Sequence, residues 1–185
     1  MLVVTGAAHG DGVSEAVTQM GGALALMGGG PVLVVDANVR APSLHSIFGV
    51  EQIPGLADVL AGRAELDAAL RSNEATLVSV LPSGNPTDDF LSLLMSQECV
   101  SLLDRLRARF RFILVDTPPM LLYPESSLMA SRSDGVVAVL RTWERNKSEL
   151  FEIQRILGAL RVTLFGVALT ERAKQTGRAR LGQRR

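Results

Sequence analysis

The sequence predicts an α/β protein with a doubly wound, mainly parallel sheet and helices on both faces of that sheet. Short apolar runs alternate with stretches of helical periodicity, which is the spacing of strand–helix–strand units. The apolar runs are continuous, as expected for strands that are buried on both faces. Ligands of such sheets bind beyond the carboxyl ends of the strands. Polar residues at these ends are therefore the first candidates for a functional site.

The first predicted strand and helix flank a glycine-rich turn. The apolar run Met1–Val4 predicts the strand, and Thr5–Ala16 has the composition of a turn into a helix. A run of three glycines, Gly28–Gly30, ends this helix, whose apolar stripe consists of Val13, Val17, Met20, Leu24 and Met27. The next run, Pro31–Asp36, predicts a buried strand that ends in an acid.

The middle of the chain is less regular. Prolines and a glycine cut residues 37–71 into short helical pieces, of which Leu56–Leu60 and Ala64–Leu70 are the expected helices. The run Leu77–Leu81 predicts a third strand.

A longer helical stretch follows a turn that contains proline and glycine. We expect Thr87 or Asp88 to be its N-cap, the helix to run to about Arg109, and a break near Ser96. Its charged residues are expected to face solvent: Asp104, Arg105, Arg107 and Arg109.

The last part of the chain predicts three strands and one helix. The strands are Phe112–Asp116, Gly135–Leu140 and Val162–Leu169, and the helix is Lys147–Leu160. No apolar periodicity remains after Thr170. We therefore expect a single domain over residues 1–170 and a flexible basic tail over residues 171–185.

Composition and charge limit the classes of function. With 185 residues, 47% of them hydrophobic, the chain can bury one substantial core. Its one cysteine, Cys99, cannot form an internal disulfide, and no apolar run approaches the ~20 residues of a membrane span. Together with the lack of a signal peptide, these features predict a cytoplasmic protein, which could be peripheral at the inner membrane.

The charge is unevenly placed. Residues 171–185 contain six Lys or Arg and one acid, which gives +5 and leaves −5 on residues 1–170. The tail is expected to be solvated, or else to contact anionic lipid headgroups. Nucleic acid is not an expected partner, because the tail offers no aromatic platform. Trp143 is either a partner contact or a core residue.

The turn Thr5–Ala16 is the main candidate for ligand binding. Its glycines let the backbone approach an anion, and the first amides of the following helix point at that anion. Asp36 and Asp116 also follow strands, so we expect both of them to converge with the turn on one site. Glycine spacing alone suits ATP and NAD equally.

Several stretches in order resemble one family. The chain resembles the cytoplasmic domain of bacterial tyrosine kinases of the CpsD/CapB type. These kinases control capsule and exopolysaccharide export and are relatives of the MinD/ParA P-loop ATPases. The turn is joined by Asp36-Ala-Asn-Val-Arg40, Arg40-Ala-Pro-Ser-Leu-His45-Ser-Ile-Phe48, Gly55-Leu-Ala-Asp-Val-Leu-Ala-Gly62, Leu81-Pro-Ser-Gly84 with Leu93-Leu94, and Phe112-Ile-Leu-Val-Asp116-Thr-Pro-Pro119.

This resemblance implies a P-loop NTPase-like fold and phosphoryl transfer from Mg-ATP. Gly10 and Gly12 would belong to the phosphate cradle, and Ser14 would supply the Mg²⁺ hydroxyl. Asp36 and Asp116 would be the catalytic acids and would also hold the metal. The other positions that the resemblance assigns to the nucleotide are Asp11, Val13, Glu15, Arg40 and Thr170.

Four positions depart from the family pattern. Val13 replaces the loop lysine, Glu15 a Ser or Thr, Asn38 the second acid of the acidic motif, and Thr170 an asparagine that contacts adenine. The Glu15 carboxylate would also repel an α-phosphate. With Asp11 the turn Thr5–Ala16 carries −2. The departures predict a degenerate site with weak or absent binding and hydrolysis of ATP.

Further features argue against an active kinase. The family carries a tyrosine-rich tail, whereas this chain has one tyrosine, Tyr123, and a basic tail. The chain also begins at the first strand, so we expect no ring assembly, although a homodimer remains compatible. The preferred interpretation is a regulatory or interaction subunit that binds a membrane-embedded polysaccharide co-polymerase or export protein.

Two alternatives remain open. One is an active ATPase or tyrosine autokinase of the same family. The other is an NAD-type protein that resembles short-chain dehydrogenases, with Asp36 on the adenosine ribose. Against the second, Tyr123 is followed four positions later by Ser127 rather than by the lysine of their Tyr-x-x-x-Lys pair.

Overall fold

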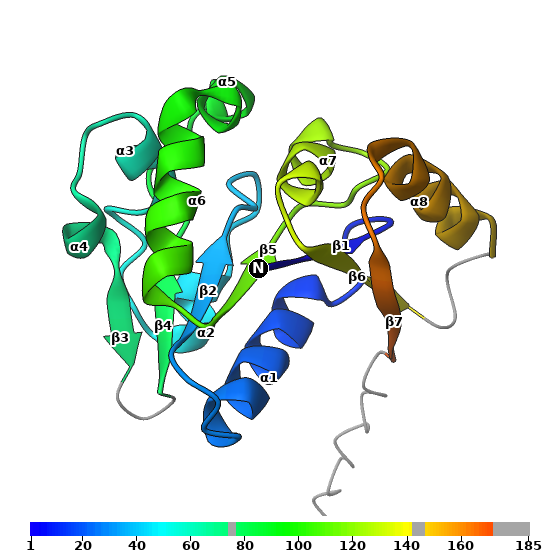
Figure 1. Cartoon of the computed structure of the whole chain (residues 1–185), viewed down its shortest axis with the longest axis horizontal. Coiled ribbons are helices and arrows are strands. Elements are labelled where there is room, and N and C mark those ends of the chain that lie inside the picture. Colours follow the sequence, from blue (N-terminus) through cyan, green and yellow to red (C-terminus); the bar gives the residue numbers. More distant parts are fainter. Residues whose placement is uncertain (74–76, 142–146, 172–185) are drawn as a thin grey trace, which may run out of the picture.

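The computed structural model describes residues 1–73, 77–141 and 147–171. Within these residues, seven strands form one sheet in the order β3-β4-β2-β5-β1-β6-β7 (Figure 1). The strands are β1 (Leu2–Gly6), β2 (Val32–Asp36), β3 (Arg71–Asn73), β4 (Val78–Leu81), β5 (Phe112–Asp116), β6 (Gly135–Arg141) and β7 (Leu164–Thr170).

All neighbouring strands are parallel except the edge pair β3 and β4, which is antiparallel. The predicted doubly wound, mainly parallel sheet is therefore confirmed. In this order β5 lies between β1 and β2, and Asp36 pairs in register with Asp116. The carboxyl ends of β1, β2 and β5 consequently meet at one edge of the sheet.

Eight helices within the described residues cover both faces of the sheet. They are α1 (Val13–Leu26), α2 (Leu44–Phe48), α3 (Leu56–Leu60), α4 (Leu66–Ala69), α5 (Phe90–Met95), α6 (Gln97–Arg109), α7 (Pro124–Ser131) and α8 (Lys147–Leu160). One apolar cluster joins the sheet to α3 through α8, and a second joins it to α1 and α2.

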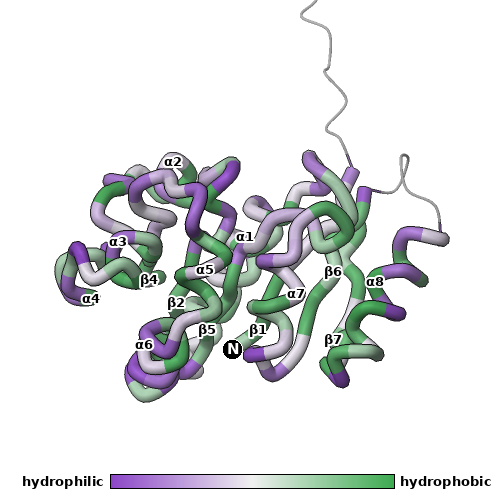
Figure 2. Tube along the Cα trace, turned by 90° about the horizontal axis from the view of Figure 1, so that it is seen from above, coloured by the Kyte–Doolittle hydropathy of each residue, from purple (hydrophilic) through white to green (hydrophobic). Residues whose placement is uncertain are grey.

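The central strands are buried on both sides. Val3 belongs to the first cluster and its neighbour Val4 to the second, and both are fully buried. This alternation follows from the two-residue period of a strand. Figure 2 shows the consequence: the central strands are hydrophobic along their length, whereas α6 and α8 alternate between hydrophobic and hydrophilic residues.

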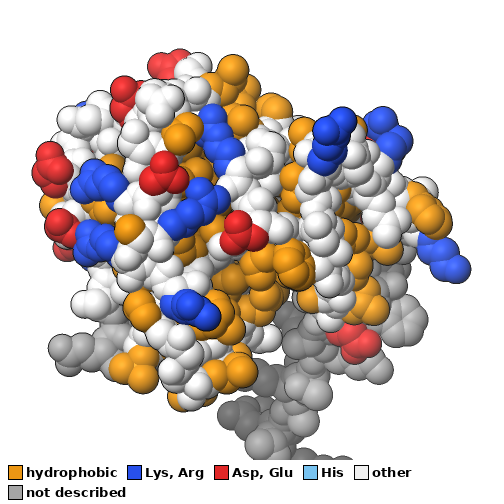
Figure 3. Space-filling view, viewed as in Figure 1, with side chains coloured by type: hydrophobic (Ala, Val, Ile, Leu, Met, Phe, Trp, Pro, Cys, Tyr) orange, Lys and Arg blue, Asp and Glu red, His pale blue; other side chains and the backbone are white. Residues whose placement is uncertain are grey.

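Several boundaries agree with the sequence prediction. The helix Lys147–Leu160 begins and ends as expected. The expected break falls at Ser96, whose hydroxyl accepts a hydrogen bond from the Cys99 amide and caps α6. Cys99 is buried. The charged residues of α6 are exposed, and Figure 3 shows acidic and basic side chains intermixed on the face that carries this helix.

The predicted start of α5 is wrong. The helix begins at Phe90 with Asp89 as its N-cap, and neither Thr87 nor Asp88 caps it. The Thr87 hydroxyl instead accepts a hydrogen bond from the Asp89 amide at 3.2 Å. Local bonding of this kind favours a turn over a helix, so the chain makes one more turn before α5 begins.

Three elements were not predicted: β3, α2 and α7. β3 consists of three polar residues at the sheet edge and α2 of only five residues. α7 has a proline in its first turn and almost no amphipathic pattern. Neither hydrophobic periodicity nor length identifies such elements. Trp143 and residues 172–185 of the basic tail lie outside the described residues.

No helix in the described part of the chain is long and apolar enough to cross a bilayer.

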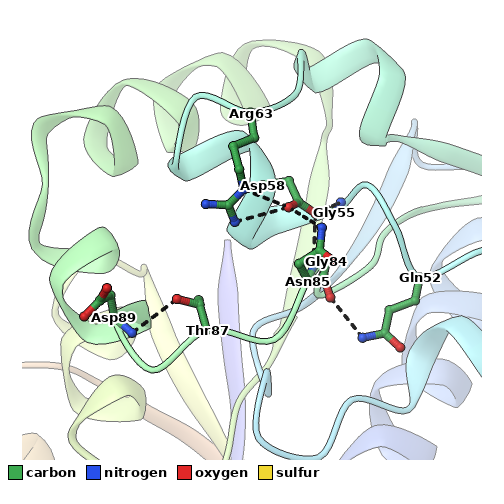
Figure 4. A network of polar contacts seen from close by, with 8 residues as sticks. All are labelled: Gln52, Gly55, Asp58, Arg63, Gly84, Asn85, Thr87 and Asp89. Carbon is green, nitrogen blue, oxygen red and sulfur yellow. Dashed lines mark hydrogen bonds and ion pairs between the residues drawn. The ribbon is translucent and has the colours of Figure 1, made fainter.

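A buried carboxylate ties the loop after β4 to α3 (Figure 4). Asp58, which is 2% exposed, accepts hydrogen bonds from the backbone amides of Gly55 and Asn85 and from the side chains of Asn85 and Arg63. Burial acts to raise the pKa of Asp58, but the hydrogen bonds from Asn85, Gly55 and Arg63 outweigh it and hold the pKa below its usual value. The charged form of Asp58 is therefore the stabilising one.

We expect Asp58→Asn to lower the free energy of unfolding by about 2–4 kcal/mol, because several hydrogen bonds to a buried charge are lost. The stabilisation should be fully present above the unfolded pKa of about 3.9 and disappear as the pH falls through the lower folded pKa. Urea denaturation from pH 7 to pH 3 measures both effects.

The control is Asp67→Asn, which removes an exposed acid that pairs with Arg109 at 2.6 Å. Such surface pairs contribute about 0–1 kcal/mol. An Asp58→Asn variant as stable at pH 7 as the control would contradict the role assigned to the network.

Candidate functional site

The turn between β1 and α1 has the backbone shape of an anion cradle. Gly10 and Gly12 have φ values of 82° and 86°, which residues with a Cβ rarely adopt. Helix α1 begins at Val13, and no side chain caps it at Gly12. The first amides of the helix therefore have no partner within the helix and remain available to a ligand.

The carboxylate of Asp11 lies beneath this loop rather than in the open site. Asp11 is 1% exposed, and its Oδ2 accepts hydrogen bonds from the amides of Ala7 and Ala8, both at 2.9 Å. These contacts stabilise the loop shape without any ligand. The side chain of Asp11 thus contacts the loop itself, while its backbone lines the site.

A cavity of about 200 Å³ lies over the loop. Its walls come from the loop and from the segments that follow β2 and β5: residues 8–15, Asn38, Ala41, Ser43, Thr117 and Pro119. None of the residues described at these walls is a Lys or an Arg. We call this cavity the loop pocket.

Ser14 and Asp116 meet directly at this end of the sheet. The Ser14 hydroxyl donates to Asp116 Oδ2 at 2.5 Å. Burial, followed by the negative charges of Asp36 and Glu15, raises the pKa of Asp116 to about 8, against the opposing effect of the Ser14 hydrogen bond. Asp116 Oδ1 has no hydrogen-bond partner within the described protein.

Asp36 is fully buried on the neighbouring strand and holds the start of α2. Its Oδ2 accepts hydrogen bonds from the amides of Ser43 and Leu44, and its Oδ1 accepts one from Asn38, all at 3.1 Å. Burial raises the pKa of Asp36 to about 6, and these backbone hydrogen bonds oppose the rise. Two buried acids therefore lie side by side.

The oxygen atoms of Ser14, Asp36 and Asp116 suit Mg²⁺, which prefers hard oxygen ligands. The orphaned Asp116 Oδ1 provides an atom that such an ion would satisfy. No cluster of three or more His, Cys, Asp or Glu side chains in the described residues could hold a metal ion. A magnesium ion here would thus need the phosphates of a ligand to complete its coordination.

Arg40 turns away from the loop pocket and binds Glu125. Its Nε and Nη2 donate to Glu125 Oε1 at 3.1 and 2.7 Å, and its guanidinium lies 4.7 Å from the centre of the Tyr123 ring. Tyr123 in turn contacts His9 of the loop, with 3.1 Å between the hydroxyl and Nε2. This cluster links the loop, the segment after β2 and α7.

Thr170 contacts the loop from β7. Its hydroxyl donates to the Asp11 carbonyl at 2.7 Å, and its methyl group lies against Gly12. Arg141 at the end of β6 donates through Nη2 to the Gly10 carbonyl. Both residues also line a groove of about 550 Å³ that shares Gly12 and Glu15 with the loop pocket.

The structure therefore brings the predicted loop residues, Asp36, Asp116 and Thr170 to one edge of the sheet, while the side chain of Arg40 points elsewhere. Sequence reasoning missed Arg141 and Glu125. Arg141 follows a predicted strand, so the rule that selected Asp36 and Asp116 could have selected it too. The pairing of Glu125 with Arg40 spans 85 residues and leaves no local signal.

The strand order decides against the dinucleotide-binding alternative. In that fold the strand of the glycine-rich loop lies next to the strand whose acid binds the ribose. Here β5 separates β1 from β2, and the carboxylate of Asp36 holds α2. The NAD interpretation is therefore not supported.

Comparison with known proteins identifies the relatives of the chain. No family model matches it. EpsB of Ralstonia nicotianae, whose own assignment as a tyrosine-protein kinase is provisional, is 30% identical over 188 residues, which cover the whole chain and 24% of EpsB. The kinase domain of the Escherichia coli tyrosine kinase ETK superposes with a TM-score of 0.87 at 25% identity, over 96% of this chain and 69% of that one. The homologues of this chain are bacterial tyrosine-protein kinases.

The chain spans about a quarter of the length of EpsB, 24%. The fold that the kinase homologues share with it is the P-loop NTPase fold. The septum site-determining protein MinD of Pyrococcus horikoshii, solved with Mg-ADP, superposes with a TM-score of 0.76 over 91% of the chain and 68% of MinD, at 22% identity. At that identity the likeness shows a common fold only.

Proposed function

We propose that this chain is a regulatory or interaction subunit of an exopolysaccharide or capsule export system, built on a tyrosine-kinase P-loop fold that hydrolyses ATP weakly or not at all. The observation that carries the proposal is the loop pocket, whose described walls contain the acid Glu15 and no Lys or Arg. Val13 occupies the position of the loop lysine, and Glu15 stands in the first turn of α1.

Catalysis should suffer more than binding from these replacements. Losing one charge-assisted contact weakens binding by about 1.5–3 kcal/mol, whereas losing a stabiliser of the transition state slows chemistry roughly 10²–10³-fold. Asp36 and Asp116 add two buried acids with raised pKa values beside the same pocket. Mg-ATP is therefore bound weakly at best.

The proposed partner is a membrane-embedded polysaccharide co-polymerase or export protein. This proposal is supported by homology to bacterial tyrosine-protein kinases and by the order of motifs shared with the CpsD/CapB type. Tyr123 is a poor phosphate acceptor for such a kinase, because its ring lies under Arg40 and its hydroxyl contacts His9. The chain has no other tyrosine.

We expect ATP turnover by the unchanged chain to equal that of Ser14→Ala, which removes the Mg²⁺ hydroxyl. A phosphate-release assay with Mg-ATP measures turnover, and calorimetry under the same conditions measures affinity. Micromolar affinity together with turnover that Ser14→Ala abolishes would overturn the proposal and indicate an active kinase or ATPase.

A further inference from the structure

Two carbonyl groups of the loop are held from outside the loop pocket. Arg141, the last residue of β6, donates to the Gly10 carbonyl, and Thr170, the last residue of β7, donates to the Asp11 carbonyl. Arg141 and Thr170 are register partners. The two anchors therefore come from adjacent ends of the same part of the sheet.

Peptide geometry makes these anchors act on the opposite side of the loop. In a planar trans peptide the carbonyl and the following N–H point in opposite directions. Fixing the Gly10 and Asp11 carbonyls toward β6 and β7 therefore turns the amides of Asp11 and Gly12 toward the loop pocket, which both residues line. The positive φ values of Gly10 and Gly12 permit this arrangement.

Other features of the pocket point to a ligand with hydrogen-bonding oxygens. Ser43 lines the pocket, and its hydroxyl oxygen is buried without a hydrogen-bond partner in the described protein. The groove beside Arg141 and Thr170 shares Gly12 and Glu15 with the pocket. A ligand with a phosphate chain in the pocket could thus place a larger group in the groove.

We propose that Arg141 and Thr170 are positioning residues that orient the loop amides toward the phosphates of a nucleoside diphosphate. This inference rests on the proposed function, in which the fold keeps a nucleotide site that does not turn over. A diphosphate is favoured over a triphosphate because each further phosphate adds negative charge beside the carboxylate of Glu15, in the first turn of α1. No Lys or Arg at the described walls of the pocket offsets that charge.

The test is calorimetric titration of the full chain with ADP and with ATP, both without divalent ions. Arg141→Gln and Thr170→Val should each weaken ADP binding about tenfold, the effect of one lost hydrogen bond. The conservative variants Arg141→Lys and Thr170→Ser should restore most of the affinity. Arg111→Gln is the charge-matched control, because Arg111 precedes β5 and lines a different cavity.

Melting temperatures of all variants, measured without ligand, separate positioning from folding. The proposal is supported if Arg141→Gln binds ADP more weakly than Arg141→Lys, and Thr170→Val more weakly than Thr170→Ser, while the melting temperatures within each pair agree. It fails if the unchanged chain does not bind millimolar ADP, if Arg111→Gln weakens binding equally, or if ATP binds more tightly than ADP. ATP turnover would overturn the proposed function but leave these ADP ratios intact.

Discussion

The double variant Val13→Lys with Glu15→Thr is expected to bind Mg-ATP roughly 10- to 100-fold more tightly than the unchanged chain, since one charge-assisted contact contributes about 1.5–3 kcal/mol. Val13 lines the loop pocket at the start of α1, so the side chain of a lysine at this position can extend along the pocket wall. Removing the Glu15 carboxylate also removes its repulsion of the ATP phosphates, which would bind at the positive end of the helix. Calorimetry with Mg-ATP measures the gain.

The matched control is Val13→Met with Glu15→Thr, which supplies a flexible unbranched side chain without the charge. It should recover only the part of the affinity that depends on Glu15. Equal affinities of the two double variants would show that the charge at position 13 does not limit binding. A gain in NAD affinity in place of Mg-ATP would favour a dinucleotide site instead.

Asp116→Asn is expected to raise the melting temperature by about 5–10 °C at pH 8 in the absence of divalent ions, which corresponds to a few kcal/mol for a chain of this size. The folded pKa of Asp116 is about 8, above its ordinary value of 3.8. Between these values the folded protein holds a proton that the unfolded chain has released. Stability therefore falls as the pH rises through this window, and asparagine removes that dependence.

The difference between Asp116→Asn and the unchanged chain should shrink as the pH falls toward 4, because the carboxyl of the unfolded chain also takes up a proton near its ordinary pKa of 3.8. Thermal melts from pH 4 to pH 8.5 follow it. Asp104→Asn, an exposed acid on α6, serves as the control and should leave the pH profile unchanged. Parallel profiles for the unchanged chain and Asp116→Asn would refute the burial of an uncompensated acid at this position.

The sheet could be predicted because each parallel strand is a continuous apolar run. Such a run is buried whichever helices and strands pack against it. Pro31–Asp36 and Phe112–Asp116 are such runs, and both become strands within one residue of the prediction. The five-residue helix α2 could not be predicted from the sequence, because its first turn is stabilised by the carboxylate of Asp36, which lies on another element. A tertiary contact of this kind has no local pattern.

The site was predictable in its position and less so in its contacts. Acids at strand ends indicated where Asp36 and Asp116 lie, since parallel strands deliver their carboxyl ends to one edge. The direction of the Asp11 side chain depends on two glycine dihedrals and could not be read from the sequence. Arg40 is a predicted nucleotide contact, and the structure adds a contact that the sequence does not indicate, between its guanidinium and Glu125.

The capping of α2 by Asp36 couples the chemistry of the site to the outer surface. The same carboxylate faces Asp116 and accepts the amides of Ser43 and Leu44. A proton or a cation at Asp36 neutralises the carboxylate and weakens its hydrogen bonds to these amides. The free energy of protonation or cation binding is therefore coupled to the stability of the first turn of α2. Linkage of this kind is reciprocal. A partner that grips α2, where Ile47 is 44% exposed, would thereby shift the ionisation of the buried acid pair.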